Sequence, residues 1–348
     1  MTESTFTRPR EATFDLLKFV AIYLVILGHC LGRLGLGMEM LNHPLGKLIV
    51  MVNMPLFIFI TGYFGQSLYK RTFMPLVVAK YRTLLRPCLV YSIVCALLCD
   101  FILMNQGITL TGGGKIILYR IVTTYWFIWV VLYCSFYSWL FVKLGDVLKL
   151  NRIIVLAVSF ILLLLIPDMR YIPHLSYFKA MYPFFLLGLL FRKTGWFELL
   201  YQKYKVIIPI CLIVYLIGYL FFKGTWSFYY FSSTPFPQVA LYYSFMVFMG
   251  VTGIVMLYLI IRKLWIKHSS SVMISKMAEA GKYTLAIYMM QGVVVEIMDC
   301  YPEQLRINDT IILTLIAVSL ATILTVLFVL IVKVILKNSI LSAYLLGK

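Results

Sequence analysis

Charged side chains are scarce in this sequence. Asp, Glu, Lys and Arg together make up 13% of its 348 residues, whereas 62% of the residues are hydrophobic. A soluble domain typically has about 25% charged residues, because it must present a polar surface to water. The composition therefore excludes an ordinary soluble protein and indicates a chain whose solvent is lipid.

The cysteines do not form the pattern of a disulfide-bonded or zinc-binding protein. The seven cysteines are odd in number and fall mostly inside apolar stretches, without the paired spacing that zinc sites require. Cys95 and Cys99 lie one helical turn apart, an arrangement that favours packing over metal binding. We expect neither a disulfide scaffold nor a metal site.

Acidic residues are the scarcest charged class, with 13 Asp and Glu against 31 Lys and Arg, which gives a net charge of +18. Such an excess can indicate nucleic-acid binding, but no basic stripe interleaved with exposed aromatic residues is present. The sequence instead contains ten apolar stretches, most of them long enough to span a bilayer. They are Phe14–Leu34, Gly46–Tyr69, Leu84–Met104, Tyr125–Val142, Ile153–Ile166, Phe178–Phe191, Val206–Phe222, Val239–Ile261, Gly281–Met298 and Ile311–Leu336.

The basic residues are distributed unequally between the loops that join these stretches. With the N-terminus inside, 21 of the 31 Lys and Arg residues fall in cytoplasmic loops, 8 in the opposite loops, and 2 (Lys18 and Arg86) within or beside spans. Cytoplasmic loops of membrane proteins carry such an excess. We therefore predict an all-α, polytopic membrane protein with about ten transmembrane helices and both termini cytoplasmic. It forms a single domain, 1–348, with a short N-terminal segment, 1–13, and resides in the cell (inner) membrane.

The first span, "FDLLKFVAIYLVILGHC", contains three ionisable residues, Asp15, Lys18 and His29. Ionisable groups in hydrocarbon need a partner, a hydrated cavity or a function. Lys18 and His29 lie eleven residues apart, close to three helical turns, so they share one face at a separation of roughly 16 Å. Asp15 precedes Lys18 by three residues and is expected to pair with it.

Other spans also contain polar residues, each open to two interpretations. Asn53 lies in "VNMPLFIFITGYF", where a proline kink for packing is the alternative to a role in a site. Arg82 and Arg86 lie four residues apart and could anchor the helix at the interface or form a fork for phosphate groups. Trp126 suits an interfacial aromatic belt, and Gln291 suits a hydrogen bond between helices.

Taken together, these stretches resemble acyltransferase family 3, whose members are ten-span membrane enzymes that O-acylate sugars of cell-surface polysaccharides. The similarity runs through nearly the whole chain in the family's order. After the opening helix it is carried by "NMPLFIFITGYF", "YRTLLRP", "YWFIWVVL", "YPFFLLGLLFRK" and "GKYTLAIYMMQ". Three positions depart from the common pattern: Gln291 replaces a frequent histidine, Thr284 a serine and Lys18 an arginine. The first departure leaves His29 as the one histidine of the pattern.

The resemblance implies a function for each of these residues. An acyl-coenzyme A, most simply acetyl-coenzyme A, would be the donor substrate, and a cell-surface polysaccharide or lipid-linked sugar the acceptor, with no permanently bound cofactor. Lys18, Arg82 and Arg86 would hold the donor's phosphates. His29 would act as general base on the sugar hydroxyl. The remaining candidates, which would orient substrate or donate to the oxyanion, are Asn53, Trp126 and Gln291.

A transporter or flippase for a lipid-linked sugar is the alternative function, since it too could use intramembrane charges and broken helices. The sequence shows no inverted or parallel repeat. This observation favours the enzyme.

Overall fold

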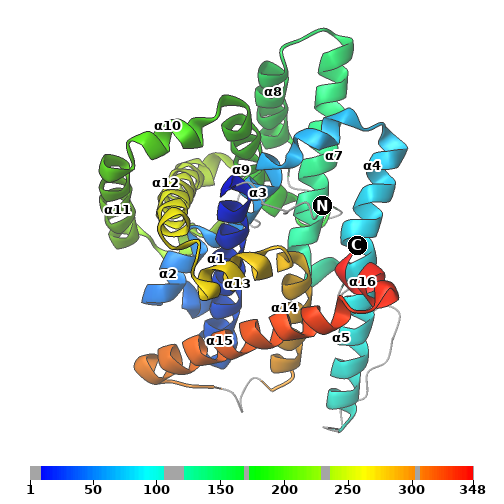
Figure 1. Cartoon of the computed structure of the whole chain (residues 1–348), viewed down its shortest axis with the longest axis vertical. Helices are drawn as coiled ribbons and strands as arrows, with labels where there is room; N and C mark the ends of the chain where they lie inside the picture. Colours follow the sequence, from blue (N-terminus) through cyan, green and yellow to red (C-terminus); the bar gives the residue numbers. More distant parts are fainter. Residues whose placement is uncertain (1–8, 106–120, 168–171, 229–235, 302–305, 348) are drawn as a thin grey trace.

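The computed structural model describes residues 9–105, 121–167, 172–228, 236–301 and 306–347, and these contain helices and no strands. The predicted all-helical class is therefore confirmed (Figure 1). The helices are α1 (Pro9–Leu31), α2 (Pro44–Val50), α3 (Asn53–Tyr63), α4 (Phe73–Lys80), α5 (Arg86–Asn105), α7 (Trp126–Val147), α8 (Arg152–Leu165), α9 (Leu175–Thr194), α10 (Trp196–Gln202), α11 (Tyr204–Phe221), α12 (Phe236–His268), α13 (Val272–Gly281), α14 (Thr284–Met298), α15 (Thr310–Ile335) and α16 (Ser339–Leu346). Short turns of 3₁₀-helix and π-helix join several of them.

Within the described residues, seven helical stretches are long and apolar enough to cross a membrane, so the chain is a multi-pass membrane protein. They are Ala12–Gly35, Pro44–Tyr63, Phe73–Leu103, Trp126–Val147, Tyr204–Phe221, Gln238–His268 and Thr310–Ile335. The other three predicted spans correspond to α8, α9 and α14, of which α8 and α14 are apolar but shorter. A total of ten spans and the cytoplasmic side of both ends remain predictions; residues 1–8 and Lys348 lie outside the described part of the chain.

The second predicted span is divided rather than continuous. Helix α2 ends at Val50 and α3 begins at Asn53, with a turn at Met51 and Val52 between them. Pro55 lies in the first turn of α3, where its missing N–H leaves no helical hydrogen bond unmade. The proline therefore marks the start of a new helix and not a kink within one.

Helix α1 occupies the middle of the fold. It packs against α3, α12, α13, α14 and α15, and Figure 1 shows it passing behind α13 and α15. Leu16, Leu17, Ala21 and Ile22 on this helix are completely buried. The opening helix, which carries the ionisable residues, is therefore surrounded by protein and not by lipid alone.

Two glycines allow α3 and α9 to pack closely. A Cβ atom at Gly188 would lie 2.6 Å from the amide nitrogen of Tyr63, and one at Gly62 would lie 2.8 Å from the carbonyl carbon of Phe185. Both distances are below van der Waals contact. Small residues at membrane helix interfaces permit the two backbones to approach closely, so α9 packs directly against α3.

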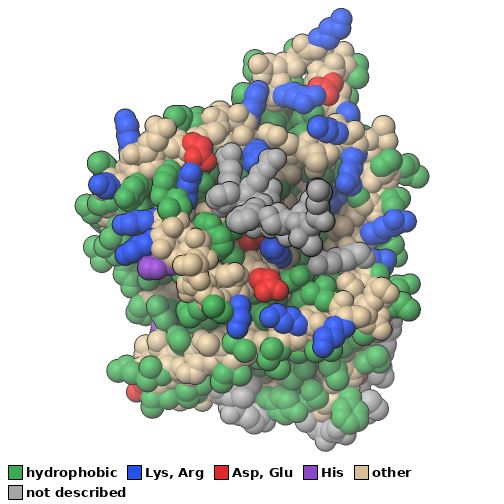
Figure 2. Space-filling model, viewed as in Figure 1, with side chains coloured by type: hydrophobic (Ala, Val, Ile, Leu, Met, Phe, Trp, Pro, Cys, Tyr) green, Lys and Arg blue, Asp and Glu red, His purple; other side chains and the backbone are tan. Residues whose placement is uncertain are grey.

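The outer surface is largely apolar, as a lipid-facing surface must be. Helix α15 exposes Ile311, Leu315 and Ile323 along its length. In Figure 2, Lys and Arg side chains lie over the upper and middle parts of the face shown, while apolar side chains cover its lower part, where Figure 1 shows α15.

Candidate active site

A cavity of about 350 Å³ lies between five segments of the fold, and we call it the central cavity. Its walls come from α1, α3, the α4 end with the following π-helical turn, α7 and α14. Most of the lining is apolar with a few polar groups, the usual composition of a ligand pocket. The lining residues are Lys18, Met54, Phe57, Ile60, Thr61, Phe64, Lys80, Thr83, Leu84, Phe127, Ile128, Val131, Thr284, Leu285 and Tyr288.

Two ammonium groups belong to the central cavity, those of Lys18 and Lys80. The Lys18 Nζ donates to Asp15 Oδ1 at 2.9 Å, one helical turn earlier on α1. The same nitrogen lies 5.2 Å from the centre of the Phe64 ring, close enough for a cation–π interaction. Asp15 and Phe64 thus hold the Lys18 side chain in a defined position at the cavity.

Helix α14 contributes a row of polar side chains on one face. Thr284 and Tyr288 line the cavity, and Gln291 follows one turn later on the same face. Gln291 is 4% exposed, and its Oε1 has no hydrogen-bond partner among the described residues. Leaving a buried acceptor unpaired costs about 1–3 kcal/mol. The orphaned oxygen makes Gln291 a candidate for contact with a bound substrate.

His29 lies on the same face of α1 as Lys18 but does not line the central cavity. Ile22 and Val25 occupy that face between them, and both are completely buried. His29 itself is half-buried. Beyond it, Arg33 Nε forms a 2.6 Å ion pair with Asp299, which ties the end of the first span to the end of α14. Along this face of α1, two buried apolar side chains thus lie between Lys18 and His29.

Arg82 and Arg86 do not join Lys18. Lys80, Thr83 and Leu84 face the cavity, which leaves the two arginines on the other side of this segment. Arg86 donates to the carbonyl of Ala343 in α16, and its guanidinium lies 5.1 Å from the centre of the Tyr344 ring. Arg82 is exposed. In this structure Arg86 fastens the C-terminal helix, and Arg82 remains available at the surface.

Asn53 and Trp126 each lie next to a residue of the cavity wall. Asn53 is buried, and its Oδ1 accepts from the amide of Met54 at 2.7 Å. Trp126 begins α7, and its ring centre lies 4.7 Å from that of Tyr177. Both are next in sequence to a lining residue, Asn53 to Met54 on α3 and Trp126 to Phe127 on α7, but neither lines the cavity itself.

Two other histidines have structural surroundings. His43 Nε2 lies 3.2 Å from the hydroxyl of Thr314, which links α2 to α15. His174 Nε2 donates to the carbonyl of Val122 at 2.6 Å. Burial lowers the pKa of both imidazoles, and in His174 the bond to Val122 opposes that effect. Burial therefore favours the neutral form of both imidazoles.

Sequence reasoning missed Lys80 and Tyr288 as cavity residues. The sequence assigned Lys80 to a cytoplasmic loop. An ideal helix through "KYRTLLRP" gives no reason to expect Lys80, and not Arg82 and Arg86, to face a site. The π-helical turn Tyr81–Leu85 separates α4 from α5 at this point. Such turns are frequent at functional sites, but the residue pattern does not predict this one.

Comparison of the whole chain with known proteins identifies its family. The acyltransferase-domain family matches residues 11–334, nearly the whole chain. The chain belongs to acyltransferase family 3. Its relatives include the nodulation protein NolL of Sinorhizobium fredii, 35% identical over 192 residues, which cover 53% of this chain and 50% of the relative. The NolL of Mesorhizobium japonicum is 27% identical over 307 residues, covering 84% of this chain and 79% of the relative.

The first of these matches spans half of the relative's own length. No solved structure matches this member of family 3. The predicted family is thus confirmed.

Proposed function

We propose that this member of family 3 is a membrane-bound O-acyltransferase. It moves an acyl group, most simply acetyl, from cytoplasmic acyl-coenzyme A to a hydroxyl of a cell-surface polysaccharide or lipid-linked sugar. It would act in the cell membrane, where the donor is reached from one side and the acceptor from the other.

One observation carries this proposal. Five of the six segments that resemble the family contribute to a single cavity: α1, α3, the turn after α4, α7 and α14. The sixth, α9, packs directly behind α3 through Gly62 and Gly188. Segments that are far apart in the sequence thus converge on one pocket, as expected for the parts of a catalytic site.

The donor would enter the central cavity with its acyl end first. Ammonium groups of Lys18 and Lys80 suit the phosphates of a coenzyme A as point charges. The exposed Arg82, one residue before Thr83 of the cavity wall, would contact the nucleotide outside. Arg86 would act indirectly, by holding α16 against this entrance. The apolar lining would enclose the acyl-pantetheine arm.

The reaction needs a base on the acceptor hydroxyl. His29 would accept that proton while the hydroxyl oxygen attacks the thioester carbonyl; the new C–O bond forms, the C–S bond breaks, and the proton passes to the leaving thiolate. Gln291, with Asn53 and Trp126, would orient the substrates or donate to the oxyanion. Ile22 and Val25, buried on the face of α1 between Lys18 and His29, would have to move if the thioester reached His29 along this face.

Donor binding tests the proposal directly. Calorimetric titration of the purified protein with acetyl- and succinyl-coenzyme A should show binding, weakened by Lys18→Gln and by Lys80→Gln. Loss of one charge-assisted contact, about 1.5–3 kcal/mol, should raise Kd about 10- to 150-fold. Lys276→Gln, which removes an exposed charge on α13, serves as the matched control. Absence of binding, or equal affinity in all three variants, would refute the donor site.

A further inference from the structure

A second and larger cavity lies away from the central one. It has a volume of about 750 Å³ and opens between α7, α8, α9 and the 3₁₀ turn Gly65–Lys70. We call it the basic groove. Its inner walls are apolar and come mainly from two helices, with Leu156, Phe160 and Ile161 on α8 and Leu186 and Leu190 on α9.

Three cationic side chains stand at one end of the basic groove. Lys70 ends the 3₁₀ turn, Arg152 begins α8 and Lys193 lies in the last turn of α9. All three come from loops that the charge distribution assigns to the cytoplasmic side. Lys70 and Lys193 are exposed and form no ion pair with a carboxylate in the described part of the chain.

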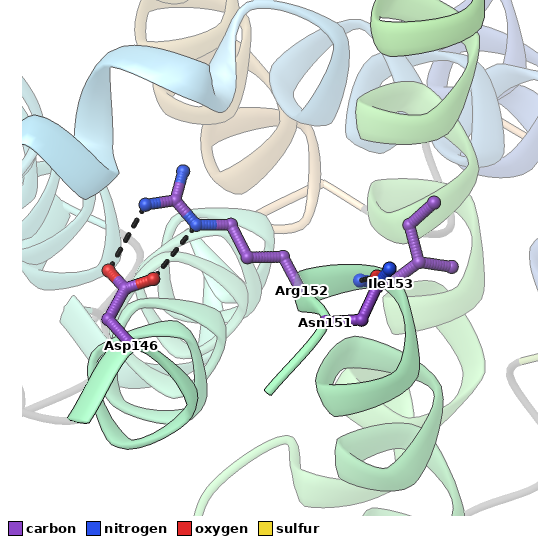
Figure 3. A network of polar contacts seen from close by, with 4 residues as sticks. All are labelled: Asp146, Asn151, Arg152 and Ile153. Carbon is purple, nitrogen blue, oxygen red and sulfur yellow. Dashed lines mark hydrogen bonds and ion pairs between the residues drawn. The ribbon is translucent and has the colours of Figure 1, made fainter. Parts of the chain in front are cut away.

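Arg152 is already held in place by its neighbour. Its Nε and one terminal nitrogen donate to the two oxygens of Asp146 at 3.0 and 3.1 Å, a fork seen in Figure 3. A guanidinium has five N–H donors, so three remain for another acceptor. Because Asp146 cancels one charge, the mouth of the groove carries a net charge of +2. Such a mouth favours an anion.

The length of the apolar part matches one leaflet of a bilayer. From Arg152 to Ile161 along α8 is about 14 Å, and from Pro183 to Lys193 along α9 is about 15 Å, at 1.5 Å per residue. The hydrocarbon core of a bilayer is about 30 Å thick, so one leaflet contributes about 15 Å. An acyl chain of a cytoplasmic-leaflet lipid would therefore fill the groove from its cationic mouth to the middle of the membrane.

We propose that the basic groove binds an anionic phospholipid of the cytoplasmic leaflet. The headgroup phosphate contacts Lys70, Arg152 and Lys193, and one acyl chain lies between α8 and α9. This site is separate from the central cavity, with which it shares no lining residue, so it stands whether or not that cavity binds acyl-coenzyme A.

Native mass spectrometry of the purified full chain tests the site, with phosphatidylglycerol and phosphatidylcholine of identical acyl chains as probes. We expect phosphatidylglycerol to bind more tightly, and the double variant Lys70→Gln/Lys193→Gln to lose about 30-fold in affinity, or about fivefold per basic residue near an anionic headgroup. The matched control Lys267→Gln/Lys276→Gln removes two exposed charges outside the groove and should bind like the unchanged protein.

A second variant separates a groove from a charged surface. Ala157→Phe keeps every charge and fills the apolar part of the groove, so it should also weaken phosphatidylglycerol binding. Equal binding of the two lipids, an unchanged affinity in Lys70→Gln/Lys193→Gln, or full binding by Ala157→Phe would each overturn the proposal. Displacement of the lipid by stoichiometric acetyl-coenzyme A would also overturn it, since it would assign the groove to the donor.

Discussion

The close packing of α3 against α9 should be unusually sensitive to a single methyl group. In Gly188→Ala, the added Cβ would lie 2.6 Å from the amide nitrogen of Tyr63 and closer still to the carbonyl oxygen of Phe59. Ordinary contact begins at 3.4 Å, so the helices must separate by at least about 0.8 Å. A gap of 0.5–1 Å forfeits about a quarter to a half of the dispersion energy of the atoms concerned. Overpacking of this kind typically costs about 1–3 kcal/mol.

Thermal unfolding of the purified protein in detergent measures this cost. We expect Gly188→Ala to lower the midpoint by several degrees. Gly65→Ala is the matched control, because its Cβ would meet only side-chain atoms, those of Phe185, Leu189 and Leu68, at 3.4–3.6 Å, which are ordinary contacts. Since α3 forms a wall of the central cavity, Gly188→Ala should also weaken donor binding. An unfolding midpoint equal to that of Gly65→Ala would contradict the packing described here.

Three further predictions follow from the site and its surroundings. Arg82→Ala should weaken acetyl-coenzyme A binding measured by calorimetry while the protein stays folded; unchanged affinity would leave Arg82 a lipid anchor. Burial lowers the pKa of His43 and His174 below the ordinary value of about 6.5, so the folded protein loses stability relative to the unfolded chain as the pH falls below 6.5. The double variant His43→Gln/His174→Gln should therefore show a smaller decrease in melting temperature with falling pH. An unaltered pH dependence would exclude these histidines as its cause. Reporter fusions at Lys348 and in loop 107–115, both outside the described residues, should report opposite sides of the membrane; the same side for both would refute the topology.

Much of the fold could be predicted because lipid imposes a simple rule on sequence. A helix-forming apolar stretch must satisfy its backbone internally, and each of the ten predicted stretches contains a helix. The division of the second span could not be placed in this way, because Pro55 is equally compatible with a kink and with a helix start. In the structure Pro55 lies in the first turn of α3.

The site was less predictable than the fold. The pattern identified Lys18 from its cost in hydrocarbon, and the structure places it at the central cavity. It could not show that Arg86 contacts α16 and that Arg82 is exposed while Lys80 lines the cavity, because a π-helical turn lies between α4 and α5 at this point. Nor could it show that the cavity does not extend along Ile22 and Val25 toward His29, since the spacing of residues on a helix face does not show which other helices cover that face.

The acetyl-transfer rate of His29→Ala tests whether His29 is the catalytic base. Purified variant and unchanged protein would be incubated with radiolabelled acetyl-coenzyme A, and acetyl transfer or hydrolysis followed alongside donor affinity. Because a general base contributes about 10²–10⁴-fold to rate, the account predicts a loss of that size with donor binding retained. Alanine variants of His43, His174 and His268 should keep their activity. Normal turnover by His29→Ala, with activity lost instead in one of those three, would contradict the mechanism.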